Sequence, residues 1–297
     1  MFWHVLIGCA PDSMGPAALD TASDELTPVF SYAIIADPHV TGSGDHDARL
    51  QAAVAETNAR VASEGIELVF ILGDIAWGDG YDLAHAALEE LTVPWVPVLG
   101  DNPIQVGEET GFEVAFSGQL DALADQVDGW ERAPRPVYNP ERDEDSWLQN
   151  ARLDHKGVRF VAMDWNSRES GIIGETPDLH DFAGGSLPFL GAALESLPDG
   201  PDKRVVLLSH MAPFPGPGGL MLDEQEKLIA LLQPHTDAVW GNHAGHLHIN
   251  SGMTWDALDI ELVTTDATWD DLNTIRIVQV LSSAATFAYL DEIITFD

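Results

Sequence analysis

The sequence predicts a mixed α/β fold in one domain, with a sheet of parallel strands and a second, antiparallel sheet. In the N-terminal half, short apolar runs alternate with helical patterns, and each run ends in polar residues. This order implies parallel β-α-β units. From Leu258 onward the chain is rich in Thr, Val, Ile and aromatic residues that alternate along it, as in antiparallel strands, and we expect these to form the second sheet that completes the core. Neither an internal repeat nor a linker divides residues 28–297.

The first β-α-β unit predicts a polar site at one sheet edge. A strand over 29–36 runs into Asp37-Pro38-His39, and a second strand over 67–72 runs into Gly73-Asp74. The helix between them spans about 47–64, and Gly65 follows it as a C-cap. Because parallel strands end at the same edge, we expect Asp37 and Asp74 to emerge side by side.

The later elements repeat this arrangement of strand and polar turn. A strand over 95–99 ends in Gly100-Asp101-Asn102-Pro103, and one over 204–209 ends in His210. We expect the region 104–150 to be an insertion beside the site. The other predicted elements are helices over about 81–91, 112–127 and 187–197, a helix opened by a capping-box-like pair of Asp223 and Glu226, and strands over 157–163, 237–240, 274–280 and 287–296.

Two histidines near the end of the chain are candidate metal ligands. Gly245-His246-Leu247-His248 places two imidazoles two residues apart after a glycine, which frees the backbone to turn sharply. A solvated loop is the alternative interpretation of this motif. His246-x-His248-x-Asn250 is also distantly similar to the HxHxD motif of β-lactamase-like zinc hydrolases, but the aspartate is missing.

The charge balance limits the partners. The chain has 13 Lys and Arg residues against 49 Asp and Glu residues, a net charge of −36. Such a surface repels nucleic acid and anionic membranes, so an anionic substrate requires a local positive centre, which metal ions would supply. Few lysines among many aspartates suggest adaptation to high salt or to an extracellular medium. Hydrophobic residues at 45% and a mean hydropathy of −0.02 exclude a disordered chain and a polytopic membrane protein.

Together these blocks resemble the calcineurin-like metallophosphoesterases, over essentially all of residues 29–297. Four of the five motifs of that family, D-x-H, G-D, a lone H and G-H-x-H, occur in order and at strand ends. The resemblance implies a four-layer α/β/β/α sandwich, two mixed sheets flanked by helices. It also implies hydrolysis of phosphate mono- or diesters, in which a hydroxide held between two metal ions attacks phosphorus in line.

The resemblance also implies the ligands. One metal would be held by Asp37, His39, Asp74 and His248, and the second by Asp74 as a bridge with His210, His246 and a residue of the third block. Carboxylate oxygen and imidazole nitrogen suit Mn, Fe, Zn or Co. Trp77 stands where the purple acid phosphatases have a ligating tyrosine, which disfavours that subgroup.

The third block departs from the family's G-N-H-[DE]. Without a gap, Asp101 takes the position of the metal-binding asparagine and Asn102 that of the histidine; a slip of one residue would make Asn102 the ligand. Asparagine can donate a hydrogen bond to a phosphoryl oxygen, but it cannot transfer a proton. We therefore expect a preference for leaving groups of low pKa or an acid borrowed from elsewhere, such as His243. A weakly active or inactive metal-binding surface module is the alternative function.

The N-terminus suggests export. Leu6-Ile7-Gly8-Cys9-Ala10 resembles a bacterial lipobox, and residues 11–27 read as a flexible tether, so residues 1–27 would be a short lipoprotein-type signal and tether. Membrane attachment would then occur only through a lipidated Cys9, and the protein would be a periplasmic or outer-membrane lipoprotein. The alternative is a frayed N-terminus on a cytoplasmic protein, because residues 1–8 are short for a signal and carry no Lys or Arg.

Overall fold

The computed structural model describes residues 25–168, 176–213, 220–269 and 273–296. Cys9 lies outside these residues, so the lipobox and the tether stay predictions.

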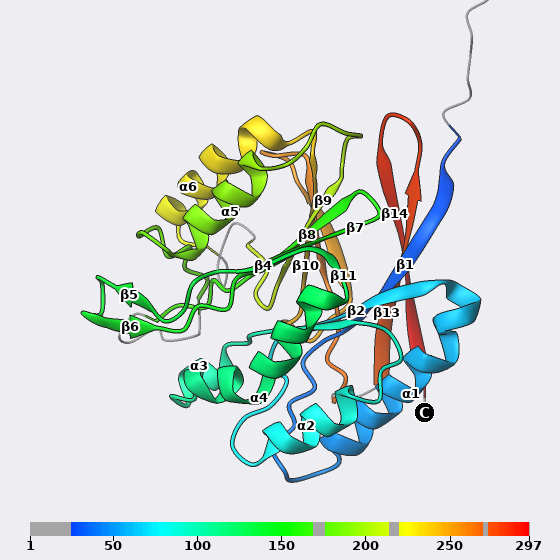
Figure 1. The fold of residues 1–297 in the computed structure, drawn as a ribbon, viewed down its shortest axis with the longest axis vertical. Coiled ribbons are helices and arrows are strands. Elements are labelled where there is room, and N and C mark those ends of the chain that lie inside the picture. Colours follow the sequence, from blue (N-terminus) through cyan, green and yellow to red (C-terminus); the bar gives the residue numbers. More distant parts are fainter. Residues whose placement is uncertain (1–24, 169–175, 214–219, 270–272, 297) are drawn as a thin grey trace, which may run out of the picture.

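Two large mixed sheets form the centre of the molecule, as Figure 1 shows. The first has the strand order β14-β13-β1-β2-β3, and the second the order β11-β12-β10-β9-β8-β7-β4. The strands of the first sheet are β1 (Thr27–Ile35), β2 (Ile66–Leu72), β3 (Trp95–Val98), β13 (Asn273–Ser282) and β14 (Phe287–Phe296). Those of the second are β4 (Asp128–Arg132), β7 (Ala151–His155), β8 (Val158–Met163), β9 (Val205–Ser209), β10 (Val239–Ala244), β11 (Ser251–Trp255) and β12 (Ile260–Thr264), and a separate hairpin contains β5 (Val137–Asn139) and β6 (Glu144–Ser146).

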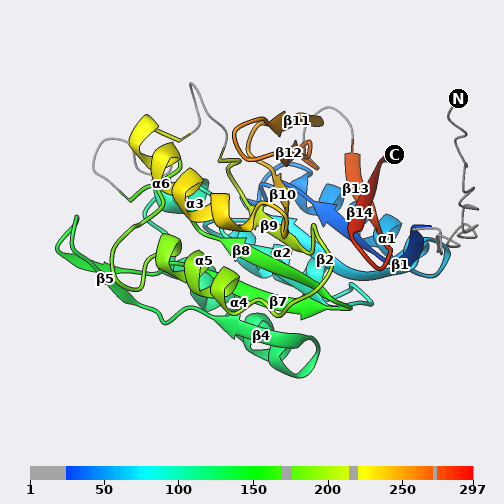
Figure 2. The same cartoon turned by 90° about the horizontal axis from the view of Figure 1, so that it is seen from above.

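Helices flank the two sheets, and Figure 2 shows α5 and α6 side by side along the seven-stranded one. The helices are α1 (His46–Glu64), α2 (Gly80–Leu88), α3 (Asn102–Gln105), α4 (Glu109–Ala122), α5 (Ser186–Glu195) and α6 (Leu222–Leu232), with short 3-10 turns η1 (Leu123–Asp125) and η2 (Gln233–His235).

Alternation along β8 shows how the layers pack. Phe160 and Ala162 belong to the core shared with the first sheet and α1, whereas Val161 and Met163 pack in the cluster formed with α5 and α6. Successive side chains of a strand point to opposite faces, so a strand buried on both faces lies between two layers. The predicted four-layer α/β/β/α arrangement is therefore the observed one.

The C-terminal strands lie in a different sheet from the one we expected. β13 pairs antiparallel with β1, with Ala33 opposite Ile277, so β13 and β14 extend the first sheet. The second sheet is built instead around the central strands β7 to β10. The alternation in the sequence was evidence for antiparallel pairing, but it carries no information about which strand is the partner.

Three local expectations have different outcomes. Gly65 is the left-handed C-cap of α1, with φ 67°, as predicted. The capping box at Asp223 is wrong: Met221 is the N-cap of α6 and makes no side-chain cap hydrogen bond. The region 104–150 is not a simple insertion, because it contains α4 and also β4, which is one of the two edge strands of the second sheet. None of the described helices is long and apolar enough to cross a membrane.

Candidate metal centre

The candidate ligands follow the carboxyl ends of five strands. β1, β2 and β3 pair in parallel, as do β9 and β10, so within each sheet these ends meet at one edge. The seven predicted ligands, with Asn102, lie directly beyond these ends: Asp37 and His39 after β1, Asp74 after β2, Asp101 and Asn102 after β3, His210 after β9, and His246 and His248 after β10.

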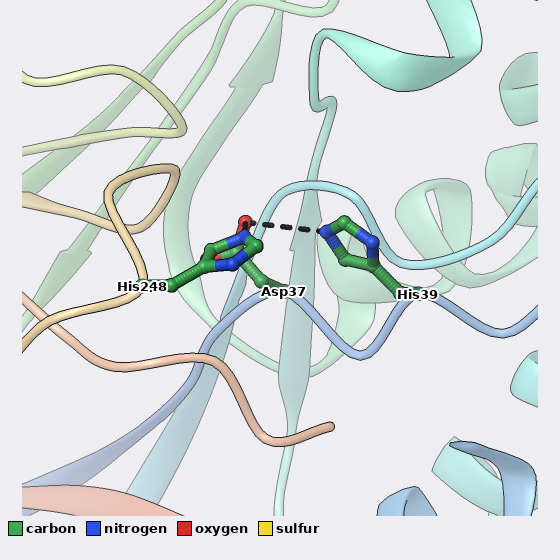
Figure 3. A group of neighbouring side chains, drawn as sticks. All are labelled: Asp37, His39 and His248. Atoms are coloured by element: carbon green, nitrogen blue, oxygen red, sulfur yellow. Dashed lines mark ion pairs between the residues drawn. The ribbon is translucent and has the colours of Figure 1, made fainter. Parts of the chain in front are cut away.

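One group of ligand atoms contains Asp37, His39 and His248. Figure 3 shows the Asp37 carboxylate between the two rings, which come from segments far apart in the sequence. Asp37 Oδ1 lies 3.8 Å from His39 Nε2 and 3.5 Å from His248 Nε2. Asp37 is completely buried, so a charge on it requires compensation by neighbours.

A second group contains Asp101, His210 and His246. Asp101 Oδ1 lies 2.6 Å from His210 Nε2 and 3.2 Å from His246 Nδ1. The side chain of Asp101 thus points at the two imidazoles. The neighbouring Asn102 instead directs both its backbone and its side-chain N–H groups to the Asp74 carboxylate.

Asp74 lies between the two groups. Its Oδ2 is 3.4 Å from His39 Nε2 and 3.6 Å from His210 Nε2. The ligand atoms of Asp37, Asp74 and His210 also lie within 4.8 Å of one another. The expected adjacency of Asp37 and Asp74 is confirmed, and one oxygen of Asp74 is near an imidazole of each group.

Two features of the histidines fit a metal ion. His39 Nε2 is buried and has no hydrogen-bond partner among the described residues, although two carboxylates lie close to it. His210 Nδ1 donates its proton to the carbonyl oxygen of Leu72, 3.0 Å away, so Nε2 is the ring nitrogen that faces the carboxylates and can bind a metal once it carries no proton. A backbone carbonyl that accepts from the remote ring nitrogen is the usual support of a metal-binding histidine.

The electrostatics of the ligands agree with a cation site. Burial alone would raise the pKa of Asp37, but the neighbouring histidines, led by His210, hold it well below its usual range. Burial alone would lower the pKa of His39, but Asp37 and Asp74 raise it to about 9. The pKa of His210 is raised in the same way, despite its burial, chiefly by Asp74 and Asp37. Protonated imidazoles supply the positive charge that stabilises the carboxylates, so protons compete with metal ions for the same ring nitrogens.

The backbone around the ligands is strained in a way that the sequence could not indicate. Five of the seven candidate ligands have positive φ, a region that non-glycine residues rarely adopt and that concentrates at functional sites. They are Asp37 (φ 48°), His39 (φ 53°), Asp74 (φ 44°), His246 (φ 65°) and His248 (φ 50°).

Gly245 permits the closest approach in the site. A Cβ atom added there would lie 2.2 Å from Asp37 Oδ2 and 2.8 Å from the Leu72 carbonyl oxygen. With glycine at this position, the next residue, His246, donates its backbone N–H to Asp37 Oδ2 at 2.9 Å. The glycine of the motif therefore allows contact between the β10 turn and the β1 turn.

Aromatic residues surround His39, and among them the sequence singled out only Trp77. The rings of His39 and His46 each pack on Trp269, with centroids 5.1 and 5.2 Å away. Trp77 contacts the His39 ring edge-on at 5.2 Å. His46 Nδ1 also lies 2.6 Å from the His39 carbonyl oxygen. The two tryptophans therefore orient the ring of this candidate ligand, and His46 orients its backbone. Only proximity in the fold relates Trp269 to this site, because the sequence around it carries no motif.

His243 is not in a position to act as the acid. It lies on β10, is completely buried, and its Nε2 is 2.8 Å from the Tyr32 hydroxyl in the core. Burial, and secondarily the charge of Arg276, holds its pKa well below its usual value. A neutral ring enclosed by the core cannot deliver a proton to a substrate at the metal centre.

Comparison with solved structures identifies the class of fold. The proposed 5′-nucleotidase from Staphylococcus aureus, solved with α-ketoglutarate, has a TM-score of 0.50 and 12% identity, and the match covers 88% of this chain and 54% of that one. The purple acid phosphatase PPD1 from yellow lupin matches with a TM-score of 0.48, 13% identity and coverage of 88% and 53%. An archaeal phosphodiesterase matches with 0.42, 11%, and coverage of 89% and 100%. The chain matches no family model, and no curated protein matches it in sequence.

The chain therefore has the calcineurin-like metallophosphoesterase fold. It spans about half the length of the lupin and staphylococcal proteins. At these identities the similarity establishes the fold, while the chemistry has to be argued from the site.

Proposed function

We propose that the protein is a binuclear metal-dependent hydrolase of phosphate mono- or diesters. The observation that carries this proposal is the convergence of three carboxylates and four imidazoles, from five strand ends, into two groups with Asp74 between them. Mixed oxygen and nitrogen ligands suit Mn, Fe, Zn or Co.

The proposed ligands fall into the two groups whose ligand atoms lie close together. Asp37, His39 and His248 would hold one cation, and Asp101, His210 and His246 would hold the other. Asp74, whose Oδ2 lies near a histidine of each group, would be a ligand to both. When bound, the pair of cations supplies Lewis acidity toward the phosphoryl oxygens and lowers the pKa of water at the site.

Asp101, rather than Asn102, is the proposed ligand of the third block. Its carboxylate lies 2.6 Å from His210 Nε2, whereas the amide of Asn102 donates to Asp74. Asn102 thereby orients the proposed bridging carboxylate. Its remaining hydrogen-bonding capacity can serve a phosphoryl oxygen, but it supplies no proton to a leaving group.

The decisive experiment combines metal analysis with hydrolysis of mono- and bis-nitrophenyl phosphate. The wild type should bind two metals at this centre and hydrolyse at least one ester. Asp74→Ala should abolish turnover, and Asp128→Ala, which removes an exposed carboxylate on β4, should not. Metal binding without turnover of either ester would favour the alternative, a metal-binding surface module of the same fold. The residue that favours this alternative is Asn102, which stands in place of a proton-transferring histidine.

We also propose that the substrate is a phosphate ester other than a nucleic acid, because the net charge of −36 repels nucleic acid.

Export and membrane attachment through Cys9 remain part of the proposal. Expression in a bacterial host, followed by mass analysis of the N-terminal peptide, tests it: a diacylglyceryl adduct on Cys9 is expected, and an unmodified cysteine in an intact chain would contradict it.

A further inference from the structure

A second cluster of ligating side chains shares no residue with the metal centre. Glu141, Asp178 and His180 place their ligand atoms within 4.8 Å of one another. Glu141 lies in the turn between β5 and β6 and is exposed, whereas Asp178 and His180 lie in the segment that follows β8. The cluster thus joins two segments of the chain that are far apart in sequence.

The His180 ring is held in a tautomer suited to cation binding. The side chain is completely buried, and its Nε2 lies 3.0 Å from the carbonyl oxygen of Asn166. A carbonyl oxygen only accepts, so Nε2 carries the proton, and in the neutral ring Nδ1 carries the lone pair.

The lone pair of His180 faces a carboxylate. Nδ1 has no hydrogen-bond partner among the residues that the structure describes, and the nearest carboxylate oxygen of Asp178, Oδ2, is 3.4 Å away. Two acceptors that face each other repel, and the contact becomes favourable when a cation lies between them. A buried histidine nitrogen without a partner is therefore a second observation that points to a ligand, beyond the acidic residues themselves.

The backbone fixes this arrangement in advance. His180 has a φ of 47°, which is rare for a residue other than glycine, and its N–H donates to Asp178 Oδ1 at 2.8 Å. That bond leaves Oδ2 on the side of Nδ1. The nearby guanidinium of Arg168 is paired with Asp164 at 2.7 Å and Glu109 at 3.1 Å, so its charge is compensated within the core.

We propose that Glu141, Asp178 and His180 form a third, separate site for a divalent cation of the Zn²⁺ or Mn²⁺ type. One imidazole nitrogen and two carboxylate oxygens are a suitable ligand set for these ions, and water completes the coordination. The cation attaches the β5–β6 hairpin to the segment around residue 178. The hairpin already makes one such contact, because Arg142 donates to the carbonyl oxygen of Arg168 at 2.9 Å.

The test counts the Zn²⁺ bound by the metal-depleted full chain, by equilibrium dialysis and elemental analysis. High KCl screens non-specific binding to the acidic surface. Glu141→Gln and Asp178→Asn each replace a carboxylate by a neutral amide of similar shape, which binds a cation more weakly, and both residues lie outside the fully buried core. Asp145→Asn is the matched control, because it removes an exposed carboxylate from the same hairpin.

Each ligand variant should bind about one Zn²⁺ fewer than the wild type and the control, or bind it at least about tenfold more weakly. Amide exchange of residues 137–146 should slow on addition of Zn²⁺ in the wild type and in Asp145→Asn, but not in the ligand variants. Equal binding in the ligand variants and the control, or equal losses in all three variants, would overturn the proposal. The difference in Zn²⁺ binding should persist in an Asp74→Ala background, so the outcome for this third site is distinguishable from the outcome for the binuclear centre.

Discussion

Replacing Gly245 by alanine should damage the metal centre without removing any ligand. The new Cβ would lie 2.2 Å from Asp37 Oδ2, whereas the lower end of ordinary van der Waals contact is 3.4 Å, so either the carboxylate of this candidate ligand is displaced or the two turns separate by about 1.2 Å. The next nearest atom is the backbone carbonyl oxygen of Leu72, at 2.8 Å, which cannot move away by a side-chain rotation.

The displaced turn carries both His246 and His248. Outer-sphere changes of this kind lower metal affinity by about 10- to 100-fold, and a misplacement of about 1 Å in an active site can reduce the rate by about 100-fold. Isothermal titration with Mn²⁺ and hydrolysis of bis-nitrophenyl phosphate measure the two effects separately.

Gly252→Ala is the matched control. Gly252 lies in β11, shortly after the same turn, and an added Cβ would meet its nearest described atoms only at 4.0 Å. We expect this variant to bind metal like the wild type. Unchanged metal affinity in a folded Gly245→Ala protein would refute the conclusion that contact between the two turns positions the histidines.

Three further predictions concern the proton donor, pH and salt. Asn102→His should raise the rate on alkyl phosphates relative to nitrophenyl phosphates by up to about 100-fold, because it supplies the missing proton donor; an unchanged ratio of the two rates would contradict this. The pKa of His39 is about 9 in the metal-free fold against an ordinary 6.5, so protonation of His39 stabilises that fold fully below pH 6.5, and this stabilisation is lost as pH rises through 9. The urea midpoint of the metal-free protein should therefore fall across this pH window, and His39→Gln should reduce the fall. With a net charge of −36, the thermal midpoint should rise with KCl concentration, and a midpoint independent of salt would show that self-repulsion is unimportant.

Much of the fold was readable from local patterns, for a physical reason. The apolar run before Asp37 and the run before Asp74 are short and bounded by polar turns, and a helix long enough for a crossover lies between them. Parallel pairing then follows from chain connectivity, and the convergence of the two aspartates follows from parallel pairing. The placement of β13 beside β1 did not follow, because a β-strand's alternation is the same for any antiparallel partner.

The sequence by itself determined the identity and order of the candidate ligands, because residue type and position at strand ends are local properties. For the third block, Gly100-Asp101-Asn102-Pro103, the sequence left open which of Asp101 and Asn102 is the ligand. Only the tertiary structure distinguished Asp101, which points at His210, from Asn102, which donates to Asp74. Tertiary structure also enclosed His243 in the core and brought His180 close to Asp178 and Glu141. Contacts of this kind depend on which segments the packed sheets bring together, and no local pattern in the chain records them.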